Sequence, residues 1–171
     1  MSENIVGVVQ ARMGSNRLRN KSMLFLHGYP IIEWIFKRVS KAEKIDQLIF
    51  AIPKTQENDV LSCYLNMQGA QVYRGSEDDV VDCIFRACHD LNPQYIVHIC
   101  ADNPLIGWKE IDNLVEYFLK NKCDYAYNHI PLNNNYADGF GAAIAPFEIL
   151  MKLHEEAKLP EHREHVFKFV L

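Results

Sequence analysis

The chain has 171 residues, a formal net charge of -4 at pH 7 and a hydrophobic content of 49%. This length suits one compact domain with its own core, so we expect a single domain over residues 1–171. No segment approaches the roughly 18 consecutive apolar residues of a membrane span. The slightly acidic balance argues against general nucleic-acid binding, and the N-terminus lacks the basic region of a secretory signal.

Cysteine usage points to a reduced compartment. The five cysteines are an odd number, none forms a CxxC motif, and most stand among apolar neighbours. This pattern predicts free cysteines in the core of a cytoplasmic protein rather than a disulfide framework. The cysteines are Cys63, Cys83, Cys88, Cys100 and Cys123.

Short apolar runs that are typical of strands alternate along the chain with longer runs of helical periodicity. The expected strands are 4–11, 47–53, 70–75, 95–102, 123–128 and 140–147. The expected helices are 31–43, about 55–67, 76–92, 108–121, 148–158 and 162–171. Pro30 suits a first helical position, Thr55 and Ser76 suit helix caps, and Gly69 suits a helix end.

This alternation predicts an α/β protein, a three-layer α/β/α sandwich with a mostly parallel sheet. Ligands of such sheets bind beyond the carboxyl ends of the strands. The motifs with chemical potential follow the predicted strands, so we expect them to gather at that edge.

A cationic loop follows the first predicted strand. It carries Arg12, Arg17, Arg19 and Lys21, a glycine at position 14, and no acidic residue. Backbone amides and these cations could bind phosphate oxygens, although a solvated basic loop would have the same composition. The loop is not a P-loop, because Asn20 rather than glycine precedes the lysine, and the lone glycine does not make a dinucleotide-binding fingerprint.

Two carboxylates could serve a metal ion. Asp102 in "CADNP" ends an almost wholly apolar strand, where it could hold Mg²⁺ against the phosphates of a nucleotide. Asp138 in "YADGF" could bring a second carboxylate. A turn-forming role is the alternative for each of them.

Two further motifs lie later in the chain. In "RGSEDDVVD", Arg74 and Ser76 could face a nucleoside, while the acidic residues suit a helix N-terminus. In "EHREHV", His162 and His165 are three residues apart and would share a helix face. Zinc is not expected there, since no further ligands complete a site.

Taken in order, the motifs "VVQARMGSNRLRNK", "LHGYPIIEWIFKRV", "RGSEDDVVD", "ADNPLI", "YNHIP", "YADGF" and "HREHV" resemble the cytidylyltransferase family of acidic-sugar activation. The resemblance is greatest to the type of the spore coat polysaccharide biosynthesis protein F, which is related to the CMP-sialic acid and CMP-Kdo synthetases. It implies a single nucleotidyltransferase-like domain with the nucleotide-diphosphosugar transferase (Rossmann-like) fold. It also implies Mg²⁺-assisted transfer of CMP from CTP to an acidic sugar, with release of pyrophosphate, for surface polysaccharide. Nucleic acid and membrane are not expected partners, and a homodimer is one expected state.

The resemblance also assigns site residues. Catalysis would involve Arg12, Lys21 and Asp102, and the metal would be held by Asp102 and Asp138. The nucleotide-binding residues would be Ala11, Arg12, Met13, Gly14, Ser15, Arg17, Lys21, Arg74 and Ser76. The sugar-binding residues would be Asn128, Asp138, Arg163 and Glu164.

The chain departs from the family pattern in three places. Arg19 and Asn20 replace the usual Pro-Gly before the motif lysine, which predicts a different loop backbone. Gly141, Ala142 and Ala143 occupy positions where relatives commonly carry metal-facing carboxylates. The chain also ends soon after "HREHV", where relatives continue with a segment that often supports dimerisation or the sugar pocket. A nucleotide-binding pseudoenzyme or regulatory subunit therefore remains an alternative, as does a glycosyltransferase that uses a nucleotide sugar.

Overall fold

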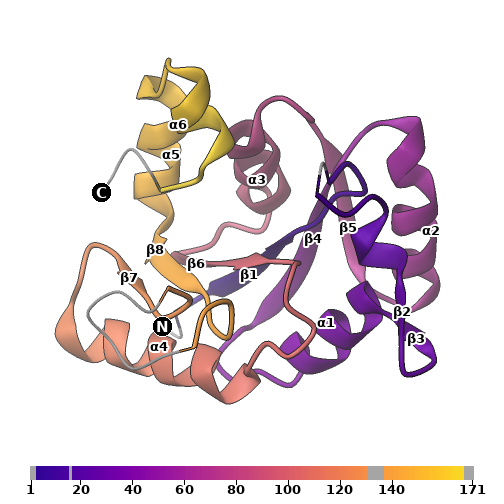
Figure 1. Cartoon of the computed structure of the whole chain (residues 1–171). Helices are drawn as coiled ribbons and strands as arrows, with labels where there is room; N and C mark the ends of the chain where they lie inside the picture. The colour runs from indigo at the N-terminus through magenta and orange to yellow at the C-terminus, as the bar shows by residue number, and fades with distance from the viewer. Residues whose placement is uncertain (1–2, 16, 131–136, 168–171) are drawn as a thin grey trace.

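The computed structural model describes residues 3–15, 17–130 and 137–167 and has a twisted six-stranded sheet between two layers of helices (Figure 1). The strand order is β5-β4-β1-β6-β8-β7, with β5, β4, β1 and β6 parallel and β8 antiparallel to both neighbours. The predicted α/β sandwich with a mostly parallel sheet is therefore confirmed.

The strands are short and the central ones are buried. Their bounds are β1 Ile5–Gln10, β4 Gln47–Pro53, β5 Gln71–Gly75, β6 Tyr95–Cys100, β7 Ala126–Tyr127 and β8 Ala143–Pro146. A separate two-stranded hairpin consists of β2 Phe25–Leu26 and β3 Tyr29–Pro30. In the register of the two central strands, Gln10 lies opposite Cys100, so these strands end together at one edge.

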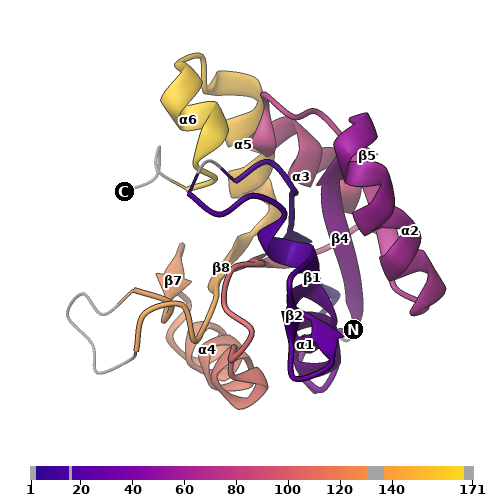
Figure 2. The ribbon, with the colours of Figure 1, turned by 45° about the vertical axis from the view of Figure 1, so that its right-hand side comes forward.

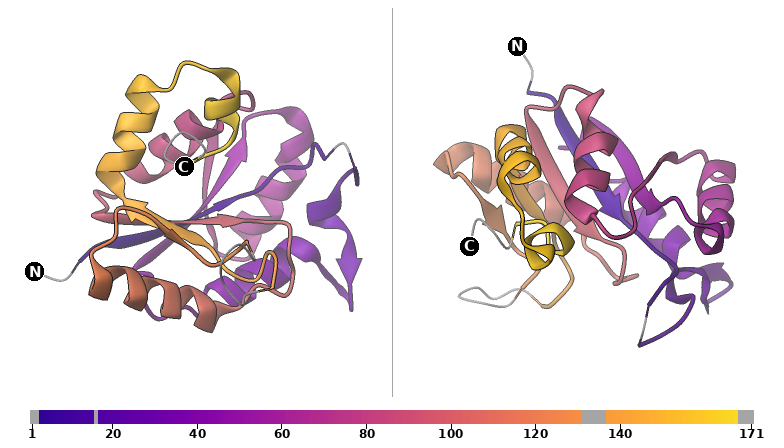
Figure 3. Two further views of the ribbon diagram at one scale, coloured as in Figure 1. Left: turned by 60° about the vertical axis from the view of Figure 1, so that its left-hand side comes forward. Right: turned by 90° about the horizontal axis from the view of Figure 1, so that it is seen from above.

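The helices divide between the two faces of the sheet because each buries its apolar stripe against it. One face is covered by α1 Ile31–Val39, α2 Asp59–Met67 and α4 Trp108–Asn121, and the other by α3 Val80–His89 and α5 Phe147–Glu156. The short helix α6 Pro160–Glu164 lies beside α3 (Figures 2 and 3). Two 3-10 turns, η1 Lys21–Met23 and η2 Gln56–Asn58, complete the elements.

The last expected helix is wrong. Of the helix expected over 162–171, residues 168–171 lie outside the described residues; in the described part, α6 starts at Pro160 and ends at Glu164, and His165 has an extended backbone. Val166 and Phe167 are buried against the core that α3 and α5 share, because their apolar side chains gain more from that packing than from another helical turn. His162 and His165 consequently do not share a helix face.

Several expected bounds also differ. The helix expected from residue 31 does begin at Ile31, but Pro30 lies before its first position instead of occupying it. Thr55 opens the 3-10 turn η2 ahead of α2. Helix α3 begins at Val80, four residues after the expected start, since Asp79 rather than Ser76 caps it by accepting from the Asp82 amide at 2.9 Å. The expected strand 123–128 is reduced to Ala126–Tyr127.

The expected burial of the cysteines is right for only two of the five. Cys83 and Cys88 are buried, Cys123 is half-buried, and Cys63 and Cys100 are exposed. All five are free thiols. Within the described ranges, every helix is too short or too polar to span a membrane.

Candidate functional site

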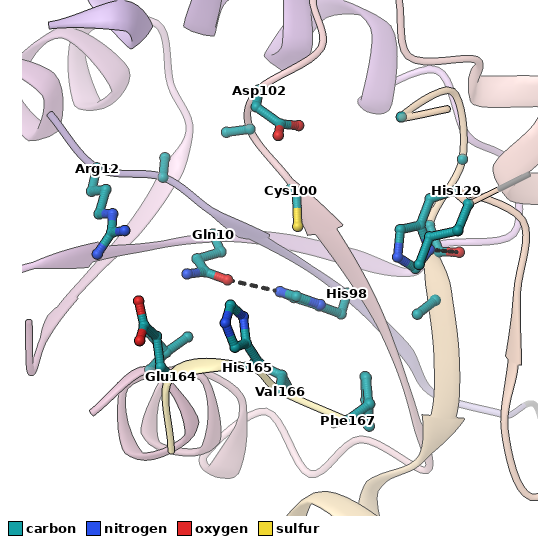
Figure 4. A pocket seen from close by; sticks show the side chains of 18 of the residues that line it. Gln10, Arg12, His98, Cys100, Asp102, His129, Glu164, His165, Val166 and Phe167 are labelled. Atoms are coloured by element: carbon teal, nitrogen blue, oxygen red, sulfur yellow. Dashed lines mark hydrogen bonds between the residues drawn. The ribbon is translucent and has the colours of Figure 1, made fainter. Parts of the chain in front are cut away.

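A pocket of about 660 Å³ opens where β1 and β6 end (Figure 4). Its walls come from the cationic loop after β1, the turn after β6, the segment around β7 and β8, and the segment that follows α6. Of the expected site residues, the structure brings together Ala11, Arg12, Ser15, Arg17, Lys21, Asp102, Asp138 and Glu164. Motifs that are far apart in sequence thus meet at the edge where parallel sheets bind ligands.

One end of the pocket is strongly cationic. Arg12 and Arg17 are exposed and Lys21 is half-buried, and all three line the pocket. Within the described part of the chain, none of the three forms an ion pair. Cations that converge without a protein partner attract an anionic ligand, and phosphate is the anion that such groups commonly bind.

Buried polar side chains hold this loop. The fully buried Asn58 accepts from the Met13 amide at 2.9 Å and donates to the Thr55 hydroxyl at 2.7 Å. The buried Ser22 hydroxyl donates to the Arg12 carbonyl at 3.1 Å. Sequence reasoning missed Asn58, because an asparagine 45 residues beyond its partner gives no local signal. The loop is therefore shaped before any ligand arrives.

Asn20 adopts a left-handed conformation, with φ 56° and ψ 22°. Glycine favours this region, and asparagine is among the few other residues that enter it readily. The replacement of the usual glycine by Asn20 is thus compatible with a tight turn into η1.

The two expected metal ligands lie in the same pocket. Asp102 follows β6, and Asp138 lies on a turn whose next residue, Gly139, has a φ of 75° and packs against the Asn103 side chain. Among the described residues, no group of three potential ligands could hold a metal without help. Two carboxylates nevertheless fit Mg²⁺, which is often bound by one or two carboxylates together with substrate phosphates.

The floor of the pocket is polar but uncharged. His98 Nε2 and Gln10 Oε1 are 3.1 Å apart, and burial lowers the pKa of His98 to about 4, so its imidazole is neutral at pH 7. Although Cys100 is accessible from the pocket, the surrounding protein desolvates its thiol and raises its pKa to about 11. Burial raises the pKa of the Tyr125 phenol to about 12. None of these three residues was expected from the sequence, since a histidine or tyrosine in an apolar run more often belongs to a core.

A second, smaller hollow adjoins the pocket on the side of α3. Both are lined by Gln10, Ala11, Arg12 and Val80, and the hollow adds Pro53, Ser76, Glu77 and others. Ser76 therefore lies next to the cationic loop, at the edge of the pocket.

Five expected site residues line neither the pocket nor the hollow. The Arg74 guanidinium binds the Pro53 and Thr55 carbonyls and the Asp59 carboxylate. Met13 is buried in the core, and Gly14 lies against the Glu57 carboxylate. The other two are Asn128 and Arg163.

Asn128 supports the backbone instead of facing a ligand. Its side chain is buried, donates to the Glu110 carbonyl at 2.7 Å and accepts from the Ala142 amide at 2.9 Å. A Cβ atom on Gly141 would lie only 1.9 Å from Asn128 Oδ1 and 2.7 Å from its carbonyl oxygen. This close approach leaves room only for glycine at position 141.

The Arg163 side chain points away from the pocket, but the residues after it line the pocket. Glu164, His165, Val166 and Phe167 form one wall, which faces Gln10 and His98 on the floor (Figure 4). The Phe167 ring lies 5.0 Å from that of Tyr125 and 6.1 Å from that of His98. We call residues 164–167 the C-terminal wall.

Comparison with known proteins gives one family. Residues 6–138 match the family model described as Cytidylyltransferase. The chain is 37% identical over 166 residues to protein MJ1063 of Methanocaldococcus jannaschii. This alignment covers 97% of this chain and 66% of that protein. It is 28% identical to the spore coat polysaccharide biosynthesis protein SpsF of Bacillus subtilis, over 72% of this chain and 53% of that protein. A 3-deoxy-manno-octulosonate cytidylyltransferase of Fusobacterium nucleatum is 29% identical over 68% of this chain and 47% of its own length. The chain thus spans about half to two thirds of these relatives.

Solved structures agree with the sequence comparison. A cytidylyltransferase from Leptospira borgpetersenii superposes with a TM-score of 0.91 and 27% identity, over 99% of this chain and 71% of that chain. A CMP-2-keto-3-deoxy-manno-octonic acid synthetase complexed with CTP has a TM-score of 0.74 and 15% identity, over 98% of this chain and 84% of that chain. The second likeness concerns the fold alone, and it confirms the expected nucleotidyltransferase fold.

Proposed function

Because the chain belongs to the cytidylyltransferase family, we propose that it transfers CMP from CTP to a hydroxyl group of an acidic sugar. In this reaction the sugar oxygen forms a bond to the α-phosphorus of CTP and releases its proton to solvent, the bond from that phosphorus to the bridging oxygen breaks, and pyrophosphate leaves. The chemistry needs positioning and charge stabilisation rather than a protein nucleophile.

The observation that carries the proposal is the juxtaposition of Arg12, Arg17 and Lys21 with Asp102 in one pocket. The three cations would bind the triphosphate and stabilise the charge that develops on pyrophosphate. The nucleoside would lie at the end of the pocket beside Ser76, where the small hollow adjoins the cationic loop. The floor and the C-terminal wall are then left for the acceptor.

A divalent cation, proposed as Mg²⁺, fits beside Asp102 and Asp138. When bound, it would neutralise phosphate charge and assist the departure of pyrophosphate. The two carboxylates would hold it against the phosphates, while Lys21 would contact the same phosphates as a point charge.

An acidic sugar is the proposed acceptor because two of the similar proteins act in sugar activation or polysaccharide synthesis by their names. Surface polysaccharide biosynthesis is the matching proposed setting. A cytoplasmic location and a homodimer belong to the same proposal, and the free thiols are compatible with a reducing compartment.

The test is release of pyrophosphate from CTP with Mg²⁺ and a panel of acidic sugars that includes sialic acid and 3-deoxy-manno-octulosonate. We expect release with at least one acceptor, and a loss of at least about 100-fold in kcat/KM for Lys21→Ala and for Asp102→Asn. Arg19→Ala is the matched control, because Arg19 is an exposed cation of the same loop that does not line the pocket. Full activity of Lys21→Ala would contradict the proposal.

A nucleotide-binding protein without turnover is the second candidate, favoured by the carboxylate-free sequence Gly141–Ala142–Ala143 beside the metal site. It predicts that CTP raises the melting temperature while no acceptor releases pyrophosphate. Turnover with any acceptor excludes this candidate.

A further inference from the structure

Arg163 lies beside the pocket without lining it, and its guanidinium makes four hydrogen bonds to protein oxygens. Its Nε and Nη2 atoms donate to Asp79 Oδ2 at 2.9 and 2.5 Å. Its Nη1 donates to the His154 carbonyl at 2.8 Å and to the Leu153 carbonyl at 3.3 Å. The side chain is only 16% exposed, so these contacts replace water almost completely.

Asp79 connects this arginine to the nucleoside side of the pocket. While one carboxylate oxygen accepts from Arg163, the other caps α3 by accepting from the Asp82 amide at 2.9 Å. The Asp79 amide donates to the Ser76 hydroxyl at 3.1 Å. Asp79 therefore connects the turn beside the hollow at Ser76, through its amide, to the start of the C-terminal wall, through its carboxylate.

We propose that Arg163 and Asp79 are positioning residues that set the place of the C-terminal wall for the acceptor. The wall begins at the residue after Arg163, and α6, which carries Arg163, has only five residues. So short a helix has little stability of its own, and its place depends on tertiary contacts. Arg163 supplies those contacts to α3 and to the carboxyl end of α5 at once.

The assignment also excludes a direct role in binding. The positive charge of Arg163 is neutralised by Asp79, and its donors already point at protein oxygens. An acceptor carboxylate would have to break this pair, and separating a largely buried ion pair is costly. Arg163 therefore acts on the acceptor through Glu164 and His165, its neighbours in the wall.

The test compares Arg163→Met, which keeps the aliphatic stem, with Arg86→Met as the matched control. Arg86 also binds a carboxylate of α3, with its Nε 2.8 Å from Asp82 Oδ1, but it lies outside the pocket. Three quantities are measured: hydrogen exchange of the amides of 164–167, the Kd for CTP, and the KM and kcat for the acceptor that the panel identifies. Only the measurement of KM and kcat for the acceptor rests on the proposed function. If that function is wrong, the hydrogen exchange and the Kd for CTP still test the proposal.

For Arg163→Met we expect amide exchange in the wall to accelerate at least about tenfold, because local opening is no longer opposed by the ion pair. The Kd for CTP should stay within about twofold, and the KM for the acceptor should rise about tenfold, more than kcat falls. Asp79→Asn keeps an oxygen for the α3 cap, and in combination with Arg163→Met it should add little. The Arg86→Met control should change none of these quantities.

Unchanged exchange in the wall would overturn the proposal, as would faster exchange with an unaltered KM for the acceptor. Equal losses of CTP and acceptor binding would indicate general destabilisation and would also overturn it. If Arg163→Met does not fold, Arg163→Lys decides by the same measurements, since lysine retains the charge but cannot reproduce the bidentate contact.

Discussion

Replacing Asn58 tests whether the cationic loop is held in place before CTP binds. Asn58 is fully buried between the loop and α2, where it accepts from the Met13 amide and donates to the Thr55 hydroxyl. Asn58→Ala removes both hydrogen bonds and leaves the Met13 amide without this partner. At about 1 kcal/mol for each bond and about 1–3 kcal/mol for a buried unsatisfied donor, the free energy of unfolding should fall by about 3–5 kcal/mol.

The effect on CTP is the decisive part of this prediction. Once released, the loop must be ordered at the moment of binding, so part of the binding energy is lost to conformational entropy. We expect the Kd for CTP to rise about tenfold or more, which corresponds to about 1.4 kcal/mol. Calorimetric titration measures the Kd, and denaturant unfolding measures the stability.

Asn121→Ala is the matched control, because Asn121 also donates to a backbone carbonyl, that of Tyr117 at 2.7 Å, but on the exposed surface of α4. It should leave the Kd for CTP unchanged. If Asn58→Ala is destabilised as expected and still binds CTP with the parental Kd, the argument that this asparagine prepares the loop is refuted.

Three further predictions concern backbone, packing and pH. Asn20→Gly should preserve stability and CTP binding. Asn20→Val should lower the free energy of unfolding by about 1–2 kcal/mol, because position 20 has a φ of 56°. Thermal unfolding measures both variants, and equal stability would argue against backbone strain at this position. Gly141→Asp should destabilise by at least about 2 kcal/mol without increasing Mg²⁺-dependent turnover, because its Cβ collides with Asn128; a stable and more active variant would contradict this. His98 has a folded-state pKa of about 4, below its ordinary value, so the unfolded chain binds a proton first as pH falls. Stability should therefore decline from about pH 6.5 toward pH 4, by about 2 kcal/mol after allowing for screening by pocket water. Denaturant unfolding at several pH values should show a weaker decline for His98→Gln, and an equal decline would count against the assignment.

Periodicity and motif order, read from the sequence alone, determined the architecture of this protein. Alternating apolar runs placed β4 at Gln47–Pro53 and α4 at Trp108–Asn121 with the correct bounds, because each segment is long and strongly patterned. The cations after β1 and the carboxylate after β6 were correctly expected at one sheet edge, since parallel strands carry their following loops to the same side.

The tertiary structure alone decided which polar residues face the pocket. Arg163 and Glu164 are adjacent in sequence but differ in their surroundings. The Arg163 guanidinium binds Asp79, which lies 84 residues earlier, while Glu164 lines the pocket. Asn58 and Asn128 likewise form bonds with backbone groups far along the chain. Local sequence cannot reveal such partners, because the need to satisfy a buried polar group arises only after distant segments have packed together. The helix expected from residue 162 ends at Glu164 for the same reason, since burial of Val166 and Phe167 outweighed local helical propensity.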